Sequence, residues 1–495
     1  MGAPPVPDKP RFPRFLLDGE VVEARDCAPT TTLLQYLRGP LGRCGTKEGC
    51  AEGDCGACTV VVGEARDGAM RYRAVNSCIR FVPTLDGKEV VTVESLRAPD
   101  GTLHPVQRAM VEAHASQCGF CTPGFVMSLF ALWLNRESVS REEAVEALAG
   151  NLCRCTGYRP IVDAATRMHS LGPSSHWPRG REHDERRRAA LPATPQGVSL
   201  PGFEAPRTVA ELAKAYAKAP DTLLLAGGTD VGLWVTKQLR DLPPIIYVGD
   251  VAELDRIEER AGALEIGAAV SLTDAYGAIV HRYPMLAELA SRFGSPPVRN
   301  SGTLCGNVAN GSPIGDSMPV LIAIGAEVVL RQDAKERTIA LEALYSGYRE
   351  KTLHRGEFVR AVRIPLPRDG RIVASYKVSK RFEQDISAAC AGFAVTLKGG
   401  VVAEARIAYG GMAATPRRAR AAEAALQGKP FAPAAIRAAV EALRGDFAPI
   451  DDMRASAAYR SRVAGALLER FLDEHGPGKQ AGKARLREFS FGESS

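Results

Sequence analysis

Three cysteines near the start of the chain have the spacing of iron ligands. Cys50, Cys55 and Cys58 follow the pattern C-x4-C-x2-C within the run C-A-E-G-D-C-G-A-C, and Cys78 follows them along the chain. Thiolates at these offsets on a loop of small residues can surround two irons, with a distant cysteine as the fourth ligand. The spacing therefore predicts a plant-type 2Fe-2S cluster, which carries one electron at a time.

A second set of four cysteines lies further along the chain. Cys118 and Cys121 occur in Q-C-G-F-C-T-P-G, and Cys153 and Cys155 occur in N-L-C-R-C-T-G-Y-R-P. A helix is expected to start at Thr122-Pro123, directly after the first pair, and another shortly after the second pair. Because helix N-termini stabilise negative charge and a four-thiolate cluster is anionic, this context favours a second 2Fe-2S site.

Structural zinc and a disulfide framework are the alternative interpretations of these cysteines. C-x4-C-x2-C with small residues between is typical of a ferredoxin loop, whereas zinc sites usually have two symmetric C-x2-C pairs. Disulfides need an oxidising compartment, and residues Met1 to Gly19 lack the apolar core of a secretory signal. The apolar stretch from Phe125 to Leu134 is too short to cross a bilayer. We therefore expect a cytoplasmic protein with reduced cysteines.

Length and charge limit the other function classes. At 495 residues the chain is too long for a single hydrophobic core. The net charge of +6 is small for this length and arises mostly from one arginine-rich run, so nucleic-acid binding is not indicated. We expect several globular domains.

The periodicity of apolar residues changes along the chain. It is strand-like up to about Ser95, apart from a short helix expected at Thr30–Leu37. It is helical from Pro105 to about Ser170, where four helices are expected. Residues 172–197 are rich in proline and charge and lack apolar periodicity, which predicts a solvated linker. The rest alternates strands and helices and ends, after about residue 374, in strands followed by alanine-rich helices.

Two glycine-rich stretches in the second half could bind a large polar ligand. The first is L-L-L-A-G-G-T-D-V at Leu223–Val231, where an apolar strand runs into two glycines whose backbone can approach a phosphate. The second, Phe293–Asp316, is dense in glycine, asparagine and hydroxyl residues, which offer many hydrogen-bond donors. Neither contains G-x-G-x-x-G, so a Rossmann dinucleotide site is not indicated, and ordinary turns remain an alternative.

Together these motifs resemble a known family. The two cysteine quartets in this order are similar to the iron-sulfur half of the molybdenum hydroxylases, the xanthine dehydrogenase and aldehyde oxidase group. The downstream A-G-G-T-D and R-N-S-G-T-L-C-G-N-V-A-N-G-S-P-I-G-D resemble the FAD domain of that group. The chain ends before any molybdopterin domain, a layout similar to the small subunit of two-subunit bacterial xanthine dehydrogenases.

The resemblance implies an α+β multidomain fold. The expected parts are a β-grasp ferredoxin-like 2Fe-2S domain (1–95), a four-helix 2Fe-2S domain (96–171), a linker (172–198), a two-part α/β FAD-binding domain (199–372), a C-terminal α+β flavoprotein domain (373–478) and a mobile tail (479–495).

The resemblance also implies roles for individual residues. Leu224 to Val231 would wrap the FAD pyrophosphate, and Thr303 to Asn307 with Asp316 would bind the rest of the diphosphate and the ribityl region. Phe293 would lie near the isoalloxazine ring, Val359 would contribute a backbone contact, and Lys377 would lie beside the flavin. The loop Ser379–Ser387 would border the opening for NAD. The implied flavin-binding residues are Leu224, Leu225, Ala226, Gly227, Gly228, Thr229, Asp230, Val231, Phe293, Thr303, Leu304, Cys305, Gly306, Asn307, Asp316, Val359 and Lys377.

The function implied by the resemblance is electron transfer. Electrons from a molybdenum centre on a partner subunit would pass through two 2Fe-2S clusters to FAD and then to NAD, during oxidation of hypoxanthine and xanthine to urate. The molybdopterin cofactor would lie on the partner, in a heterotetramer of two pairs, and no acid-base catalytic residue is expected in this chain. The alternatives are the equivalent subunit of another molybdenum hydroxylase, for an aldehyde, nicotinate or other N-heterocycle, and a flavin-free ferredoxin-type carrier.

Four cysteines fall outside the two quartets. Cys27, Cys44, Cys305 and Cys390 are expected to be buried small apolar residues and not ligands. A lone thiol without a nearby base is also a poor candidate for a catalytic nucleophile.

Overall fold

The computed structural model describes residues 10–192 and 197–477. They belong to two compact units. Unit 1 comprises Met1–Val251 and Gly294–Gly302, and unit 2 comprises Ala252–Phe293 and Thr303–Ser495. The predicted tail, residues 479–495, lies outside the described residues. Within the described part of the chain, every helix is too short or too polar to span a membrane.

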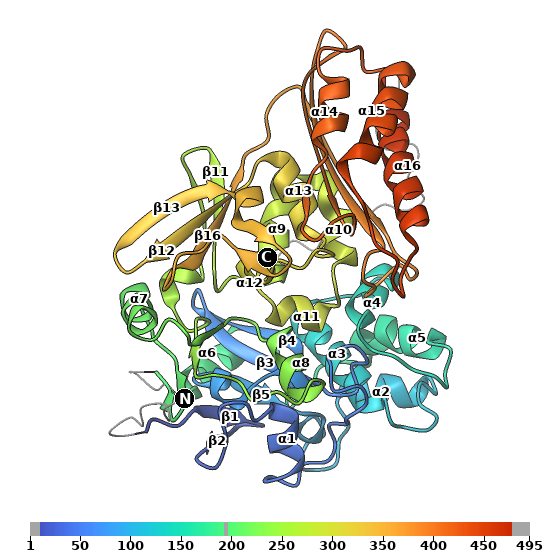
Figure 1. The fold of residues 1–495 in the computed structure, drawn as a ribbon. Helices are drawn as coiled ribbons and strands as arrows, with labels where there is room; N and C mark the ends of the chain where they lie inside the picture. Colours follow the sequence, from blue (N-terminus) through green and yellow to red (C-terminus); the bar gives the residue numbers. More distant parts are fainter. Residues whose placement is uncertain (1–9, 193–196, 478–495) are drawn as a thin grey trace. The chain divides into compact units, whose positions relative to one another are not determined.

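Unit 1 begins with a five-stranded mixed sheet, drawn in blue in Figure 1. Its strand order is β2-β1-β5-β3-β4, with β1 and β5 parallel and the other neighbours antiparallel. Helix α1 covers one face, and its Leu33 and Leu37 share a core with Phe15 and Val60. Thr32 caps α1 through a capping box with Gln35, which explains why the helix expected at Thr30–Leu37 forms there. The elements are β1 (Arg14–Leu17), β2 (Glu20–Glu23), α1 (Leu33–Arg38), β3 (Thr59–Arg66), β4 (Ala69–Asn76), η1 (Ser77–Ile79), η2 (Val82–Leu85), β5 (Glu89–Val91) and η3 (Val93–Ser95).

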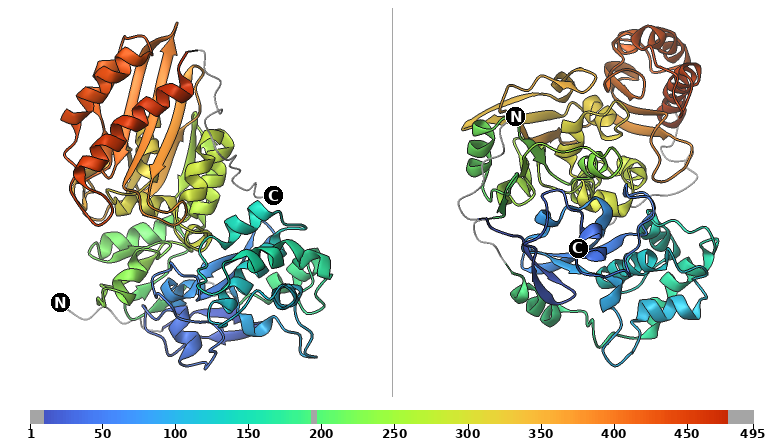
Figure 2. Two further views of the ribbon diagram at one scale, coloured as in Figure 1. Left: turned by 90° about the vertical axis from the view of Figure 1, so that its right-hand side faces the viewer. Right: turned by 60° about the horizontal axis from the view of Figure 1, so that its bottom comes forward.

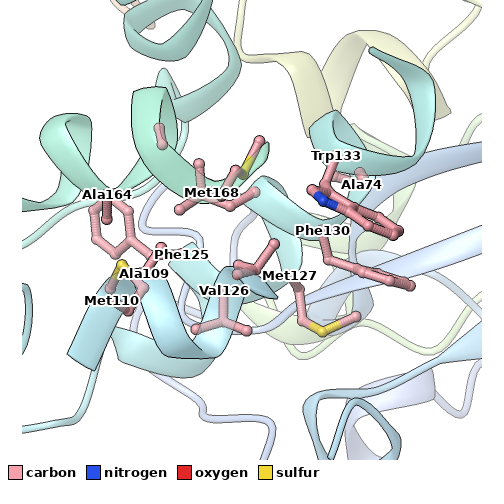
Figure 3. Packing of buried hydrophobic residues seen from close by; sticks show 14 of the residues in the cluster. Ala74, Ala109, Met110, Phe125, Val126, Met127, Phe130, Trp133, Ala164 and Met168 are labelled. Atoms are coloured by element: carbon pink, nitrogen blue, oxygen red, sulfur yellow. The ribbon is translucent and has the colours of Figure 1, made fainter. Parts of the chain in front are cut away.

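Four helices and a short 3-10 turn come next, as the periodicity predicts. They are α2 (Pro105–Glu112), α3 (Thr122–Asn135), α4 (Arg141–Leu148), α5 (Arg159–Arg167) and η4 (Met168–Leu171). Helix α3 is central: Figure 3 shows its Phe125, Phe130 and Trp133 among side chains of α2 and α5. Ser140 and Glu143 form the capping box of α4. The N-cap of α3 is Cys121, one residue before the expected Thr122.

The segment expected to be a solvated linker contains helix α6 (Arg181–Ala190). The helix packs through its charged side chains. Arg187 pairs with Glu89, whose side chain is fully buried, and its guanidinium lies 4.5 Å from the ring centre of Trp177. Sequence periodicity did not reveal α6 because an arginine stem and guanidinium bury well against an aromatic face without any apolar stripe.

The remainder of unit 1 is a small four-stranded sheet with order β6-β7-β9-β8. β9 runs parallel to both β7 and β8, with helices in the connections, which is the expected α/β arrangement. Leu225, Ile245 and Tyr247 form its core with Phe203. The elements are β6 (Ser199–Leu200), β7 (Phe203–Glu204), α7 (Val209–Lys218), β8 (Leu223–Leu225), α8 (Val231–Thr236), β9 (Ile245–Tyr247) and, from later in the chain, α11 (Pro296–Ser301).

Unit 2 begins with a five-stranded sheet of order β10-β11-β16-β12-β13 and its helices. All neighbouring strands are antiparallel, so this half of the expected α/β domain does not have parallel strands. The elements are η5 (Ala252–Leu254), β10 (Ile257–Arg260), β11 (Ala263–Gly267), α9 (Leu272–Arg282), η6 (Pro284–Leu286), α10 (Ala287–Arg292), α12 (Leu304–Asn310), α13 (Ser317–Ile324), β12 (Glu327–Gln332), β13 (Lys335–Ala340), η7 (Leu341–Leu344), β14 (Tyr345–Gly347), β15 (Glu350–Lys351) and β16 (Phe358–Pro365).

Unit 2 ends in a second antiparallel sheet of order β17-β18-β19-β20. Helices α14, α15 and α16 cover one face, as the left view of Figure 2 shows, and Phe393 and Phe471 meet in the core between them. Helix α13 packs closely against β18: a Cβ atom at Gly392 would lie 2.4 Å from the backbone of Val320. The elements are β17 (Arg371–Val378), β18 (Ala389–Lys398), β19 (Val401–Gly410), β20 (Arg417–Arg418), α14 (Arg420–Leu426), α15 (Pro433–Asp446) and α16 (Ala457–His475).

Candidate iron-sulfur and flavin sites

The β3–β4 hairpin brings the first cysteine quartet together. Cys58 directly precedes β3 and Cys78 follows β4, and the pairing of Thr59 with Asn76 places these two strand ends side by side. Cys50 and Cys55 lie in the preceding loop, in which Gly53 and Gly56 have positive φ. Glycine adopts such φ angles without strain, so the loop can fold back on itself. The four predicted ligands therefore lie at one end of the sheet.

The thiols of this quartet are grouped in pairs. The thiol of Cys55 contacts Cys50, and this contact, with backbone N–H groups, lowers the pKa of Cys50 to about 4. The N–H groups of Glu52, Asp54 and Cys55 donate to Cys50 Sγ at 3.4, 3.4 and 3.3 Å. N–H bonds to sulfur favour the thiolate, which is the form that binds iron.

The second pair of the first quartet consists of Cys58 and Cys78, both buried. The Cys78 thiol donates to Cys58 and lowers the pKa of Cys58, while the same contact and burial raise the pKa of Cys78. Charge on Cys50 acts on both, so the two pairs are neighbours. Asn76 Nδ2 lies 3.9 Å from Cys58 Sγ.

The second quartet has the same grouping. Cys121 contacts Cys153, and Cys118 contacts Cys155. Burial, followed by the contact with Cys153, raises the pKa of Cys121 to about 12. Burial opposes ionisation of Cys153, but hydrogen bonds from Thr156 and neighbouring groups lower its pKa. Cys118 and Cys155 are exposed, so this site reaches the surface of unit 1.

This donor set fits a two-iron cluster. Each 2Fe-2S centre takes four cysteine thiolates, two on each iron, and each quartet supplies two neighbouring pairs. Among the described residues, no three His, Cys, Asp or Glu side chains gather closely enough to hold a single ion. All twelve cysteines are free, so none of the eight predicted ligands is used in a disulfide.

The cysteines outside the quartets only partly match the expectation. Cys305 and Cys390 are buried, as predicted, and Cys27 is half-buried. Cys44 is exposed, so the expectation of a buried apolar residue is wrong there. Its backbone carbonyl accepts hydrogen bonds from Arg38 and Lys47, and this holds the turn without using the side chain.

The first predicted flavin stretch lies in unit 1. Leu224 and Leu225 end β8, Ala226 to Asp230 form a turn, and Val231 starts α8. A Cβ atom at Gly227 would lie 2.0 Å from the carbonyl oxygen of Ser301, and Gly228 has a φ of +72°. The first glycine is therefore required by close packing against another segment of unit 1, and the second by its backbone conformation.

The other predicted flavin residues lie in unit 2. Thr303 caps α12 by accepting from the Gly306 N–H at 3.0 Å, which fixes the turn that contains Leu304 and Cys305. The side-chain oxygen of Asn307 is buried without a hydrogen-bond partner among the described residues. Phe293 packs on Tyr276 with ring centres 5.4 Å apart, and Val359 is buried in β16. An unpaired buried acceptor within a predicted ligand motif fits the binding of a polar ligand there.

Two predicted flavin residues pair with each other. Lys377 Nζ donates to Asp316 Oδ2 at 2.6 Å, and both side chains are less than one-tenth exposed. The Ser387 hydroxyl donates to the other oxygen of Asp316. Lys377 also reaches the carbonyl of Arg292, the residue before Phe293, at 3.2 Å. The structure thus brings Phe293, Asp316 and Lys377 to one region of unit 2.

Arg292 is a residue that the sequence did not single out. It is buried, and its guanidinium donates to the carbonyls of Phe382 and Lys377 and lies 4.6 Å from the Phe382 ring centre. It therefore fixes the start of the loop Ser379–Ser387 that we expect to border the NAD opening. Its position directly before the predicted flavin residue Phe293 is the feature of the sequence that could have pointed to Arg292.

Comparisons with known proteins cover nearly the whole chain. The matching families are the 2Fe-2S iron-sulfur cluster binding domain (residues 15–82), the 2Fe-2S binding domain (92–166), the FAD binding domain in molybdopterin dehydrogenase (199–367) and the CO dehydrogenase flavoprotein C-terminal domain (374–475). The α+β multidomain fold predicted from the sequence is thereby confirmed.

The similar proteins are dehydrogenases of xanthine and of carbon monoxide. The chain is 34% identical to the xanthine dehydrogenase of Emericella nidulans over 88% of its length, and 31% identical to the xanthine dehydrogenase/oxidase of Rattus norvegicus over 81%. It spans 36% and 34% of those two proteins. A solved carbon monoxide dehydrogenase chain from Hydrogenophaga pseudoflava is 32% identical, with a TM-score of 0.51, over 54% of this chain and 94% of that one.

These matches define the class. The chain belongs to the molybdenum hydroxylase family, as an iron-sulfur and FAD portion similar to those of xanthine and carbon monoxide dehydrogenases. This portion is an oxidoreductase component with two 2Fe-2S domains and an FAD-binding domain, the parts that transfer electrons.

Proposed function

We propose that this chain is the iron-sulfur and FAD subunit of a xanthine dehydrogenase. Its role is to transfer electrons from a molybdenum centre on a partner chain to NAD during oxidation of hypoxanthine and xanthine to urate. The observation that carries the proposal is the presence, in one chain, of two thiol quartets grouped in pairs, followed by an FAD-binding domain. The clusters carry one electron each, whereas NAD takes two. The transfer therefore needs a group, such as FAD, that can exchange either one or two electrons.

The residues of this chain hold and tune the cofactors. When bound, the 2Fe-2S clusters carry single electrons and FAD couples them to hydride transfer with NAD. The proposed iron ligands are Cys50, Cys55, Cys58 and Cys78 for one cluster and Cys118, Cys121, Cys153 and Cys155 for the other. The N–H groups that point at Cys50 stabilise its negative charge, and such bonds adjust cluster potentials.

The residues that we propose to contact the flavin are the same ones that were predicted from the sequence. They are Leu224 to Val231, Phe293, Thr303 to Asn307, Asp316, Val359 and Lys377. The unpaired oxygen of Asn307 and the charged pair of Asp316 and Lys377 offer the polar groups that a ribityl chain or ring edge needs. Arg292 supports this set by anchoring the backbone of Lys377.

Xanthine is favoured as the partner's substrate by the extent of the similarity. The similarity to xanthine dehydrogenases runs over 88% of the chain and includes both iron-sulfur domains and the flavin half. The similarity to the solved carbon monoxide dehydrogenase chain covers 54%. A subunit for another substrate, such as carbon monoxide or an N-heterocycle, is the second candidate, favoured by the CO dehydrogenase flavoprotein C-terminal domain at residues 374–475.

A molybdenum-binding partner is supported by the same comparisons. The chain spans about a third of the matched xanthine dehydrogenases, which leaves most of their length without a counterpart in the matched region. We propose that the substrate-oxidising part lies on a large subunit and that two such pairs form a heterotetramer.

The proposal is tested on the purified chain by its cofactor content. Two 2Fe-2S clusters and one FAD require about four irons and one flavin per chain. Acid-labile sulfide, iron analysis and the visible spectrum measure these ratios. Iron without flavin would instead establish the flavin-free ferredoxin-type carrier, and zinc in place of iron would contradict the electron-transfer role.

A further inference from the structure

Helix α8 lies against the turn that carries one end of the first cysteine quartet. Its Leu233 packs on a buried cluster that contains two proposed iron ligands, Cys58 and Cys78. A Cβ atom at Gly232 would lie 2.8 Å from the Cβ atom of Ile79, in the 3-10 turn η1. Real Cβ atoms almost never approach so closely, so the helix needs glycine to reach this position. One face of α8 therefore covers the buried pair of the quartet.

The C-terminal end of α8 binds the loop of the same quartet. The hydroxyl of Thr236 donates to the carbonyl of Ala51 at 2.6 Å, and Nζ of Lys237 donates to the carbonyl of Cys50 at 2.9 Å. Both acceptors lie at the start of the loop between Cys50 and Cys55. The helix thus holds two adjacent carbonyls of this loop, and one of them belongs to a proposed iron ligand.

Lys237 brings positive charge to an acidic loop. Within four residues of Cys50 the loop itself carries three carboxylates, those of Glu48, Glu52 and Asp54. Lys47 is also near in the sequence, but its ammonium donates to the carbonyl of Cys44 at 2.6 Å.

Glu52 is a partner of this lysine. Lys237 Nζ lies 4.0 Å from Glu52 Oε2, and the two side chains are 44% and 39% exposed. Two opposite charges from different elements therefore meet beside Cys50, and neither is shielded completely from water.

Charge at this place acts on the cluster that we propose for the quartet. A 2Fe-2S centre held by four thiolates is anionic, and reduction makes it more negative by one unit. A nearby ammonium group attracts the reduced form more strongly than the oxidised form, so it favours reduction. A carboxylate at the same place has the opposite effect.

We propose that Lys237 is a positioning residue that acts through Cys50 and raises the reduction potential of the first proposed cluster, and that Glu52 partly offsets this effect. Reduction adds one electron to the cluster, and no bond is made or broken. The electron comes from a molybdenum centre on the partner chain in the proposed reaction and from dithionite in the test below. The inference rests on the proposed function, because it requires a 2Fe-2S cluster at this quartet.

The variants Lys237→Gln and Glu52→Gln test the inference with opposite signs. Each removes one charge and leaves the backbone donors of the loop unchanged. Lys237→Arg keeps the positive charge. Lys214→Gln is the matched control, since Lys214 has the same charge and is exposed on α7. Thr236→Val removes the neighbouring hydrogen bond to the loop without changing the charge.

The measurement is a redox titration of the holoprotein followed by electron paramagnetic resonance. The signal that is lost in Cys55→Ser identifies the first cluster. Lys237→Gln should lower the equilibrium constant for reduction of this cluster about tenfold, or ~59 mV for one electron. Glu52→Gln should shift the potential upwards. The second cluster is an internal control, and its potential should not change in either variant. Lys237→Arg and Lys214→Gln should leave both potentials as in the natural protein.

Ionic strength separates an effect of charge from an effect of structure. Because the side chain of Lys237 is partly exposed, salt should screen its charge. The difference in potential between the natural protein and Lys237→Gln should therefore become smaller at high salt. A difference that does not change with salt would contradict a role of the charge.

The outcomes distinguish this inference from the proposed function. Iron content and the visible spectrum establish that each variant holds both clusters. An unchanged potential in Lys237→Gln, or an equal shift in Thr236→Val, would overturn the inference. If Lys237→Gln lost iron, an unchanged or lower potential in Glu52→Gln would do so. Absence of 2Fe-2S signals in the natural protein would overturn the proposed function instead.

Discussion

At the scale of single residues, the chemistry of this chain depends on how backbone N–H groups are directed. Cys50 receives three of them, from Glu52, Asp54 and Cys55, because Gly53 and Gly56 let the loop turn around its sulfur. Each N–H bond stabilises negative charge on sulfur, and an iron-bound thiolate is such a charge. The loop is therefore organised for the bound form of the site.

Serine at Cys55 should remove one cluster and leave the other. The hydroxyl is a poor ligand for this iron, and the second quartet is complete without Cys55. The Cys55→Ser protein should contain about half the iron of the natural protein, and one of two signals should disappear from its reduced electron paramagnetic resonance spectrum. Flavin content should stay unchanged. Cys44→Ser, which alters a cysteine outside the quartets, is the control, and equal iron in both variants would remove Cys55 from the ligand set.

The pair of Asp316 and Lys377 makes a residue-scale prediction about stability. Replacing Lys377 with methionine leaves a buried carboxylate without its cation, and such a loss costs about 3–5 kcal/mol. The double variant with Asp316→Asn should recover much of this loss, because no charge then remains buried. Urea unfolding of the flavin-free protein, followed by circular dichroism, measures the free energy of unfolding of the single and the double variant. Equal destabilisation by the single and double variants would mean that the pair is not coupled.

His104 predicts a pH dependence of stability. It is the N-cap of α2, lies between Phe130 and Trp133, and burial lowers its pKa from 6.5 to about 3. Below pH 6.5 the His104 side chain takes up a proton in the unfolded chain but stays neutral in the folded chain. The free energy of unfolding therefore falls as pH decreases. The contribution is about 1.4 kcal/mol per pH unit between the two pKa values.

The variant His104→Asn isolates this contribution. Asparagine keeps an N-cap acceptor and does not titrate in this range. The difference in unfolding free energy between the natural protein and the variant should therefore change between pH 6.5 and 4 and be constant above pH 7.5. A difference that does not vary with pH would show that His104 is not buried as a neutral group.

At the scale of elements, helix α6 follows the second iron-sulfur domain along the chain and precedes the FAD-binding domain. The helix is held by Arg187, which lies on Trp177 and pairs with Glu89. Glu89 also accepts from the hydroxyl of Tyr72 at 3.2 Å, so the carboxylate is shared between strand β4 and the helix. Removing Arg187 leaves Glu89 buried with one neutral partner, which is unfavourable.

Limited proteolysis tests this packing. Arg187→Ala should make α6 open more often, and trypsin should then cut within residues 181–188 faster than in the natural protein. Arg186→Ala is the matched control, since Arg186 is exposed on the same helix and its loss also removes one cleavage site. Equal cleavage rates in the two variants would mean that Arg187 does not hold the helix. Mass spectrometry of the first fragments identifies the sites.

The limits of sequence-based prediction are visible in the same elements. The cysteine quartets and the short helix at Thr30–Leu37 were predictable because each depends on residues close together in the sequence; the caps that the structure shows at Thr32 and Ser140 are local in the same way. Helix α6 was missed because it buries a charged side chain. The hydrogen bond from the Asn151 side chain to the carbonyl of Gly56 was missed because the two residues lie 95 residues apart and nothing local in N-L-C-R-C marks the contact. The close packing of Gly227 against Ser301 was also missed, because Ser301 is distant in the sequence; its proposed contact with phosphate stays a prediction.

At the scale of the whole molecule, the matched domains define which part of the proposed reaction this chain can be tested for by itself. The four matched domains run from residue 15 to residue 475 and are iron-sulfur and flavin domains. Each quartet lies in its own domain of unit 1, and the second is the more exposed: Cys118 and Cys155 are exposed, whereas Cys50 and Cys55 are half-buried and Cys58 and Cys78 are buried. The more exposed site is better placed to exchange electrons with another molecule.

The isolated chain should therefore catalyse only the part of the reaction that its own domains support. With FAD bound, it should oxidise NADH with an artificial dye as acceptor, and it should not convert xanthine to urate. Adding the proposed molybdenum subunit should produce NADH formation that depends on xanthine, measured by absorbance of NADH and of urate. Asp316→Ala should lower flavin content and NADH-dye activity together, while the complex should keep part of its xanthine oxidation with an acceptor that takes electrons from the clusters. Urate formation by the isolated chain, or full flavin and NADH activity in Asp316→Ala, would contradict the proposed division between subunits or the flavin assignment.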